Sequence, residues 1–123
     1  MKNSDVGDQE TADKWEAQLR KGCLELAILA VLLDAKLYGL EILQRVECDS
    51  GLIISEGTIY PLLSRLKVLG LVKTEWVESE SGHPRKYHAL TPAGGRRLRE
   101  MATTWRSFSA SMGRLLVPLG KGK

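Results

Sequence analysis

Residues 55 to 70, SEGTIYPLLSRLKVLG, constrain the fold more than any other stretch of the chain. Apolar side chains recur there every three or four positions, which is the spacing of one buried helix face. The other positions are polar or basic, so only one side of the helix can lie in a core. The segment therefore predicts an amphipathic surface helix whose buried stripe consists of Ile59, Leu62, Leu63, Leu66 and Leu69.

The exposed faces of this predicted helix carry Thr58, Ser64, Arg65 and Lys67. Hydroxyl and cationic groups are the ones that hydrogen-bond phosphates and base edges in DNA. The pattern thus predicts a helix that enters a DNA groove. An ordinary amphipathic surface helix would show the same pattern, so the neighbouring segments must separate the two interpretations.

Pro61 limits where this helix can begin, because a proline beyond the first turn removes a backbone hydrogen bond. With Thr58 as the N-cap, Pro61 would occupy the third helical position, where its missing N–H costs nothing. With Ser55 as the N-cap, Pro61 would imply a kink. In both cases the free amides near Gly57 and Thr58 would suit a phosphate contact.

Charge is distributed unevenly along the chain. Residues 1–56 carry 6 Lys and Arg against 11 Asp and Glu, whereas residues 57–123 carry 12 against 4. The basic half starts inside the helix described above. This asymmetry indicates an anionic partner for the C-terminal half, although a basic helix face is also compatible with simple solvation.

Composition favours one soluble domain. A chain of 123 residues with 43% hydrophobic and 27% charged residues can bury a core without disulfides or metals. The longest apolar run, residues 23–33, contains Glu25 and is too short to span a bilayer. No export signal opens the sequence, so we expect a cytoplasmic location and no membrane partner.

Cysteine and histidine usage argues against a metal site. Cys23 and Cys48 are far apart and form no CxxC pair, so both are expected to be reduced and half-buried. His83 and His88 flank a predicted strand without a carboxylate or thiol at ligand spacing. We therefore expect no metal and no cofactor.

Two helices are predicted ahead of the segment 55–70. Residues 1–13 are polar and without periodicity, as in a mobile arm, and a helix from residue 14 continues into the apolar run CLELAILAVLL. A second helix opens at Tyr38 and Gly39 and ends at Gly51. The second helix and the helix predicted over residues 55–70, joined by a short turn, match a helix-turn-helix, although any helical hairpin would fit the pattern.

The period changes from helical to alternating after Gly70. Residues 72–77 and 85–90 predict the two strands of a β-hairpin, separated by the turn-rich sequence SESG. The returning strand is basic, so His83, Arg85 and Lys86 could reach phosphates or a minor groove. A hairpin that only covers the core would have the same pattern.

The final predicted helix starts with Thr91 as N-cap and Pro92 at the first helical position. Its apolar residues alternate in steps of three and four, which is the seam of a coiled coil. We interpret this seam as a homodimer interface, while folding back on its own domain is the alternative. The seam consists of Leu98, Met101, Trp105, Phe108, Met112 and Leu115.

Four segments in this chain resemble the PadR family of bacterial transcriptional regulators. They are LRKGCLELAIL, YGLEI, EGTIYPLLSRLKVLGLV and GHPRKYHALTPAG. The single C-terminal helix is similar to the short subfamily, whose members are winged-helix homodimers that bind operator DNA. The resemblance implies a mostly α-helical fold with a small β-hairpin, that is, a winged helix-turn-helix followed by a dimerisation helix.

The resemblance also implies roles for individual residues. It assigns the segment 55–70 to the major groove, with Gly57, Thr58, Tyr60 and Ser64 near bases and phosphates, and it assigns backbone contacts to Tyr38, Arg85 and Lys86. In the short subfamily a small hydrophobic or aromatic effector binds between the dimer helices near a tryptophan and releases the DNA. Trp105 and Trp15 are the candidates for that role here, although interface packing is the more ordinary role for an aromatic residue such as Trp105 in a seam.

These inferences divide the chain into an arm (1–13), a winged helix-turn-helix domain (14–91), a dimerisation helix (92–117) and a tail (118–123). The function that they predict is a DNA-binding transcriptional repressor. A winged helix that binds a protein instead of DNA is the alternative, favoured by the acidic Glu75, Glu78 and Glu80 beside the hairpin. An enzyme is not expected, because no nucleophile lies beside a histidine and no glycine-rich phosphate loop is present.

Overall fold

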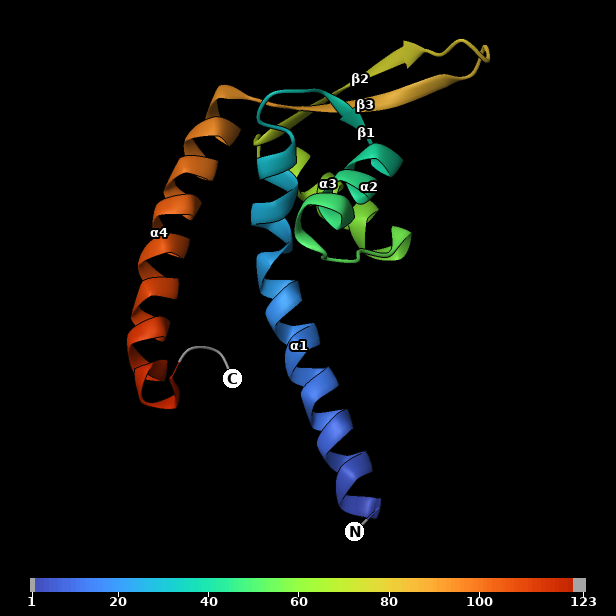
Figure 1. Ribbon diagram of the computed structural model, residues 1–123. Coiled ribbons are helices and arrows are strands. Elements are labelled where there is room, and N and C mark those ends of the chain that lie inside the picture. Colours follow the sequence, from blue (N-terminus) through green and yellow to red (C-terminus); the bar gives the residue numbers. More distant parts are fainter. Residues whose placement is uncertain (1, 121–123) are drawn as a thin grey trace.

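The computed structural model describes residues 2–120, with side chains described from residue 10 onward. Most of the chain is helical, and the strands form one small antiparallel sheet, so the predicted fold class is confirmed (Figure 1). No helix among the described residues is long and apolar enough to cross a membrane. The elements are α1 (Lys2–Val31), β1 (Leu37–Tyr38), α2 (Gly39–Ser50), α3 (Glu56–Val68), β2 (Val72–Glu78), β3 (Pro84–Leu90), α4 (Pro92–Leu116) and the short 3-10 helix η1 (Val117–Leu119).

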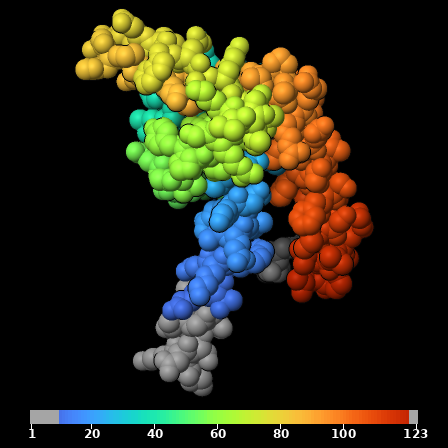
Figure 2. Space-filling view, turned by 180° about the vertical axis from the view of Figure 1, so that it is seen from behind, coloured from blue at the N-terminus to red at the C-terminus, as the bar shows by residue number. Residues whose placement is uncertain are grey.

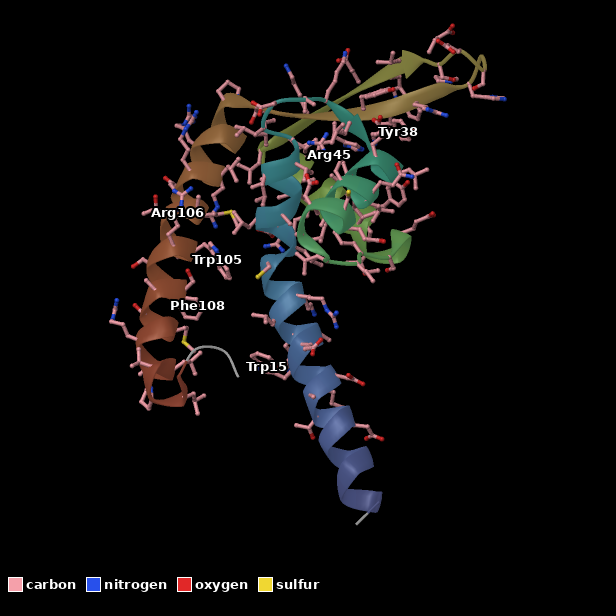
Figure 3. The ribbon with its side chains drawn as sticks, in the orientation of Figure 1. Trp15, Tyr38, Arg45, Trp105, Arg106 and Phe108 are labelled. Carbon is pink, nitrogen blue, oxygen red and sulfur yellow. The ribbon has the colours of Figure 1, made fainter. Side chains whose placement is uncertain are left out.

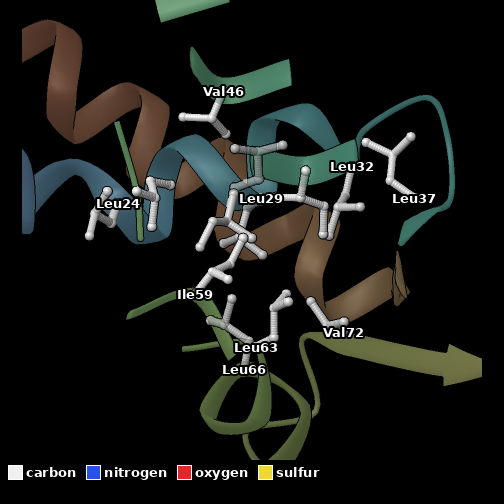
Figure 4. Close-up of a cluster of buried hydrophobic side chains, with 13 residues drawn as sticks. Leu24, Leu29, Leu32, Leu37, Val46, Ile59, Leu63, Leu66 and Val72 are labelled. Carbon is white, nitrogen blue, oxygen red and sulfur yellow. The ribbon is translucent and has the colours of Figure 1, made fainter. Parts of the chain in front are cut away.

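The core forms where the second half of α1 meets α2, α3 and the sheet (Figure 4). The apolar run of α1 supplies Leu24, Ile28, Leu29 and Leu32, as its composition predicts. Cys23 is half-buried as expected, whereas Cys48 is exposed on α2. The remaining members of the cluster are Leu37, Ile42, Val46, Ile54, Ile59, Leu63, Leu66, Val72 and Leu98.

Helix α1 begins at Lys2, earlier than the predicted start at residue 14. The predicted helix start at residue 14 is therefore wrong, and the segment predicted as a mobile arm has a helical backbone over the described residues 2–13. Adding residues to an existing helix gains one hydrogen bond per residue, whereas starting a helix is costly. A stable core helix can thus extend through a polar segment that has no apolar periodicity of its own.

Helix α2 has the two ends that the sequence predicts. The carboxylate of Glu41 accepts a hydrogen bond of 3.1 Å from the backbone N–H of Tyr38. At the other end Gly51 adopts a left-handed conformation (φ 77°), and its N–H donates to the carbonyl of Glu47 at 2.8 Å. An L-residue with a side chain would be strained at this φ, which explains why glycine terminates the helix.

Helix α3 uses Ser55 rather than Thr58 as its N-cap, so Pro61 lies inside the helix. Ile59, Leu63 and Leu66 are buried and Leu62 is partly buried, as predicted. Leu69 is exposed, contrary to the prediction, because the helix ends at Val68 and Gly70 then turns the chain away with φ 77°.

The sheet has the strand order β1-β3-β2. The predicted hairpin is confirmed, and its register pairs Val72 with Leu90 and Trp76 with Lys86. The short strand β1 was not predicted, because two residues are too few to show alternation. Pairing of Leu37 with His88 joins the start of α2 to the hairpin, and His88 lies inside β3 rather than at its flank.

Helix α4 starts as predicted, with Thr91 as N-cap and Pro92 in the first turn. The Thr91 hydroxyl accepts from the N–H of Gly94 at 2.9 Å and donates to the carbonyl of Gly70 at 2.6 Å. Its own N–H donates to the carbonyl of Leu71 at 3.1 Å. These bonds fix α4 to the junction between α3 and β2.

Helices α1 and α4 lie side by side near the sheet and separate toward the far end of α4 (Figure 1 and Figure 2). Leu98 is buried and Met101 is partly buried against the core of the same chain. These two residues of the predicted seam thus contact their own chain, and the homodimer seam stays a prediction. Trp105, Phe108, Met112 and Leu115 remain exposed.

Candidate nucleic-acid interface

A groove of about 480 Å³ lies between α3, the start of α2 and the hairpin. We call it the wing groove. Its residues are spread between positions 38 and 88 of the sequence, and the fold brings them to one place. It is lined by Tyr38, Gly39, Tyr60, Leu63, Ser64, Lys67, Thr74, Trp76, Arg85, Lys86 and His88.

The wing groove is cationic. Lys67 comes from α3, and Arg85 and Lys86 come from β3, while no aspartate or glutamate is among the lining residues. All three cations are exposed. Serine, threonine and tyrosine hydroxyls supply further hydrogen-bond donors beside them. A surface of this kind suits an anionic ligand that carries several charges, such as a phosphodiester strand.

Tyr60 reaches the groove because Gly39 has no side chain. A Cβ atom at Gly39 would lie 2.7 Å from Cε1 of Tyr60 and 2.8 Å from its hydroxyl oxygen. The tyrosine ring therefore rests on the first residue of α2. This close approach explains the glycine after Tyr38, which the sequence alone did not explain.

Arg85 stacks on one aromatic ring, and a second ring supports the first. Its guanidinium carbon lies 4.5 Å from the centroid of the Tyr38 ring, a cation–π contact. Tyr38 in turn meets Tyr87 edge to face, with the ring centroids 5.5 Å apart and the rings inclined by 79°. Stacking restricts the rotamers of Arg85 before any ligand arrives, which reduces the entropy lost on binding.

His88 lies at the bottom of the groove with only 4% of its surface exposed. Its Nδ1 atom is buried and has no hydrogen-bond partner. Burial, together with the smaller effect of the Lys86 and Lys67 charges, lowers the pKa of this imidazole from 6.5 to about 4. His88 is therefore neutral near pH 7.

The remaining predicted contacts lie outside the wing groove. Gly57 and Thr58 are exposed in the first turn of α3, and Thr58 lines a separate hollow with Arg20 and Lys21 of α1. The N–H of Thr58 donates to the Ser55 carbonyl at 3.0 Å, so this amide is already used within the helix. Of the two predicted phosphate-binding amides, only that of Gly57 has no such bond.

Arg65 and His83 also lie apart from the groove. Arg65 pairs with Glu25 of α1 at 3.0 Å, which ties α3 to the core helix. His83 is exposed at the tip of the hairpin, where its carbonyl accepts a 2.6 Å hydrogen bond from the Ser79 hydroxyl. Of the predicted contacts, the structure thus gathers Tyr38, Tyr60, Ser64, Lys67, Arg85 and Lys86 in one groove.

Sequence reasoning missed Trp76 and His88 as residues of the groove. The alternation of Val72, Thr74 and Trp76 assigned these residues to one face, and that face is the one turned toward α3. The acidic residues beside the hairpin do not enter the groove. Glu75 instead pairs with Lys36 at 2.9 Å, and the hydrogen bond and charge of Lys36 lower the pKa of its carboxyl.

Comparison with known proteins decides the family. The model of the transcriptional regulator PadR-like family matches residues 28–100, which is more than half of the chain. The chain belongs to the PadR-like family. The match spans α2, α3 and the hairpin, so the wing groove lies within the part of the molecule that defines the family.

Solved PadR-like regulators share the fold. A PadR family transcriptional regulator from Eggerthella lenta is 32% identical, covers 91% of this chain and 97% of its own, and superposes with a TM-score of 0.81. A PadR-like regulator from Bacillus cereus is 33% identical (81% and 97% covered, TM-score 0.74), and one from Bacteroides fragilis is 39% identical (83% and 98% covered, TM-score 0.68). This PadR-like chain is accordingly a transcriptional regulator.

A second set of hollows lies along α1 beside Trp105 of α4. Trp105, which is 43% exposed, lines both a hollow of about 340 Å³ and a mostly apolar one of about 330 Å³. Cys23 and Leu26 of α1 also line both. Trp15 lines neither hollow, although its side chain extends from α1 toward α4 (Figure 3).

Proposed function

We propose that this PadR-like regulator is a homodimeric repressor that binds operator DNA through the wing groove and the exposed face of α3. The observation that carries the proposal is the groove itself, in which three cations meet without a carboxylate. Lys67, Arg85 and Lys86 would bind phosphates, and Tyr60 and Ser64 on α3 are close enough to meet base edges.

The exposed apolar faces of α1 and α4 support a dimer. Trp105, Phe108 and Met112 stand in one row on α4, and Trp15 and Leu19 are exposed on α1. Apolar side chains of this size are rarely left together in water by a soluble monomer. A second copy would cover them and would present two recognition helices to a palindromic site, with half-sites about 10 base pairs apart or a multiple of that.

Salt dependence tests the DNA proposal. Electrophoretic mobility shifts with the regulator's own promoter are compared at two salt concentrations for the wild type, Lys67→Ala and Lys86→Ala. Affinity should fall steeply with salt. Each variant should bind more weakly, and its log affinity should depend less steeply on log salt concentration, by the equivalent of about one phosphate contact. Binding that is absent, or that does not depend on salt, would favour the alternative of a protein partner.

We further propose that a small planar aromatic molecule binds beside Trp105 and releases the DNA. The two hollows that flank this side chain support the proposal, because one of them is lined almost wholly by apolar atoms. Titration with a flavin should quench tryptophan fluorescence in the wild type and in Trp15→Phe, and much less in Trp105→Ala. Equal quenching in the wild type and Trp105→Ala would remove Trp105 as the effector site.

A further inference from the structure

Trp76 is a large apolar side chain that is not buried in the core. It lies on β2 and is 68% exposed. Along the same face of this strand Val72 is buried and Thr74 is partly buried, so exposure increases as the hairpin leaves the core. Trp76 is therefore the first position on this face that lies beyond the core, where a polar residue would fold as well.

The register places Trp76 among the cations. Directly paired residues of antiparallel strands share a face of the sheet, and Trp76 pairs with Lys86 while Thr74 pairs with His88. All four residues line the wing groove, and Lys67 faces them from α3. The indole thus forms an apolar wall of a groove whose other groups are mostly cationic or hydroxylic.

The shape of the groove matches one strand of duplex DNA. A helix in the major groove and a hairpin in the neighbouring minor groove have a single sugar–phosphate strand between them. Along such a strand, charged phosphates alternate with deoxyribose rings that expose C–H groups. Lysines separated by an aromatic side chain match this alternation of charge and apolar surface.

We infer that Trp76 is a DNA contact that packs against a deoxyribose of the strand in the wing groove, between phosphates bound by Lys67 and Lys86. The inference rests on the proposed DNA-binding function and adds a residue to it. Because every nucleotide carries the same sugar, the contact contributes affinity without sequence preference. A fluorescein-labelled duplex of mixed sequence is therefore a suitable probe.

The test measures fluorescence anisotropy of this duplex at several NaCl concentrations. Trp76→Ala should weaken binding about fivefold without changing the salt slope, since no charge is removed. Trp76→Phe should retain most of the affinity. Lys86→Ala should weaken binding and also flatten the slope by about 0.9. Leu33→Ala, which truncates an exposed leucine beyond α1, is the matched control and should bind like the wild type.

A second readout is intrinsic fluorescence. Saturating duplex should quench tryptophan emission in the wild type, and Trp76→Phe should abolish that change. The thermal midpoint of Trp76→Ala should equal that of the wild type, which separates a contact from a structural role. Unchanged affinity of Trp76→Ala beside a weakened Lys86→Ala would overturn this inference alone. Failure of the wild type to bind duplex at low salt would overturn the proposed function as well.

Discussion

Gly94 lies where α4 passes very close to the backbone of Leu71. A Cβ atom there would meet the carbonyl oxygen of Leu71 at a distance that no packing allows, and the side chain of Leu90 at 3.1 Å. Its neighbour Gly95 would meet only the flexible end of Arg99, at 3.6 Å. Close packing therefore requires glycine at position 94, whereas the contact with Arg99 does not require it at position 95.

Replacing each glycine by alanine should therefore have different effects on stability. Gly94→Ala must push α4 away from the start of β2, and we expect a loss of at least about 2 kcal/mol in the free energy of unfolding. Gly95→Ala should be neutral or stabilising by up to about 1 kcal/mol, because alanine is the better helix former. Urea denaturation of both variants measures the difference, and equal effects would contradict it.

His88 should make stability depend on pH. Its pKa is about 4 in the folded chain and 6.5 ordinarily, so the unfolded chain takes up the proton first as the pH falls. Its contribution is complete above about pH 6.5 and is lost toward pH 4, at most about 3 kcal/mol. His88→Phe should remove this part of the slope of unfolding free energy against pH.

His83 provides the control for that measurement. It is exposed at the hairpin tip, so His83→Gln removes one imidazole without disturbing the core and controls for the loss of a histidine as such. Subtracting the wild-type curve from each variant removes the contribution of the carboxyl groups, which also titrate toward pH 4. A His88→Phe curve parallel to that of the wild type would show that His88 is not the source.

At the scale of elements, short capping segments fix how helices and strands meet. Periodicity predicted where α2, α3, the hairpin and α4 lie, because each has one apolar face and one polar face. It did not predict β1 or the choice of Ser55 over Thr58 as a cap. Such local choices depend on a few hydrogen bonds whose strength is set by neighbours that are distant in sequence.

Thr91 is a capping residue that ties α4 to the connection between α3 and β2, since its backbone and hydroxyl reach Gly70, Leu71 and Gly94. Thr91→Ala should destabilise the fold by about 1 to 2 kcal/mol, because it leaves the Gly94 N–H and the Gly70 carbonyl without their partner. Thr103→Ala, in the exposed middle of α4, should change the unfolding free energy by less than about 0.5 kcal/mol. Thermal or urea denaturation compares the two variants.

At the scale of the molecule, α4 has two halves with different environments. Its first half packs on α1, and its second half carries an apolar row that stays exposed among the described residues (Figure 3). The seam of three- and four-residue steps is continuous across both halves. The same pattern therefore describes an intrachain contact up to Met101 and the proposed dimer contact beyond it.

Phe108→Glu tests that second half. Phe108 is 57% exposed, so the variant should fold, and a charge in the proposed interface should convert a dimer into a monomer. Ala110→Glu adds the same charge on the far side of the helix, since two positions are turned by about 200°. It should remain dimeric. Light scattering after size exclusion measures both masses, and two dimers would contradict the proposed interface.

The sequence by itself determined the positions of α2, α3, the hairpin and α4, the family resemblance and the basic character of the C-terminal half, because periodicity and charge are local properties. Only the tertiary structure decided which residues act together. Four predicted contacts lie on α3, but they face two sides. Ser64 and Lys67 line the wing groove beside the hairpin. Arg65 pairs with Glu25 of α1, and Thr58 lines the hollow beside α1. The tertiary structure also turned Trp76 and His88 toward the wing groove, because the register of β2 and β3 depends on contacts between strands rather than on either strand alone.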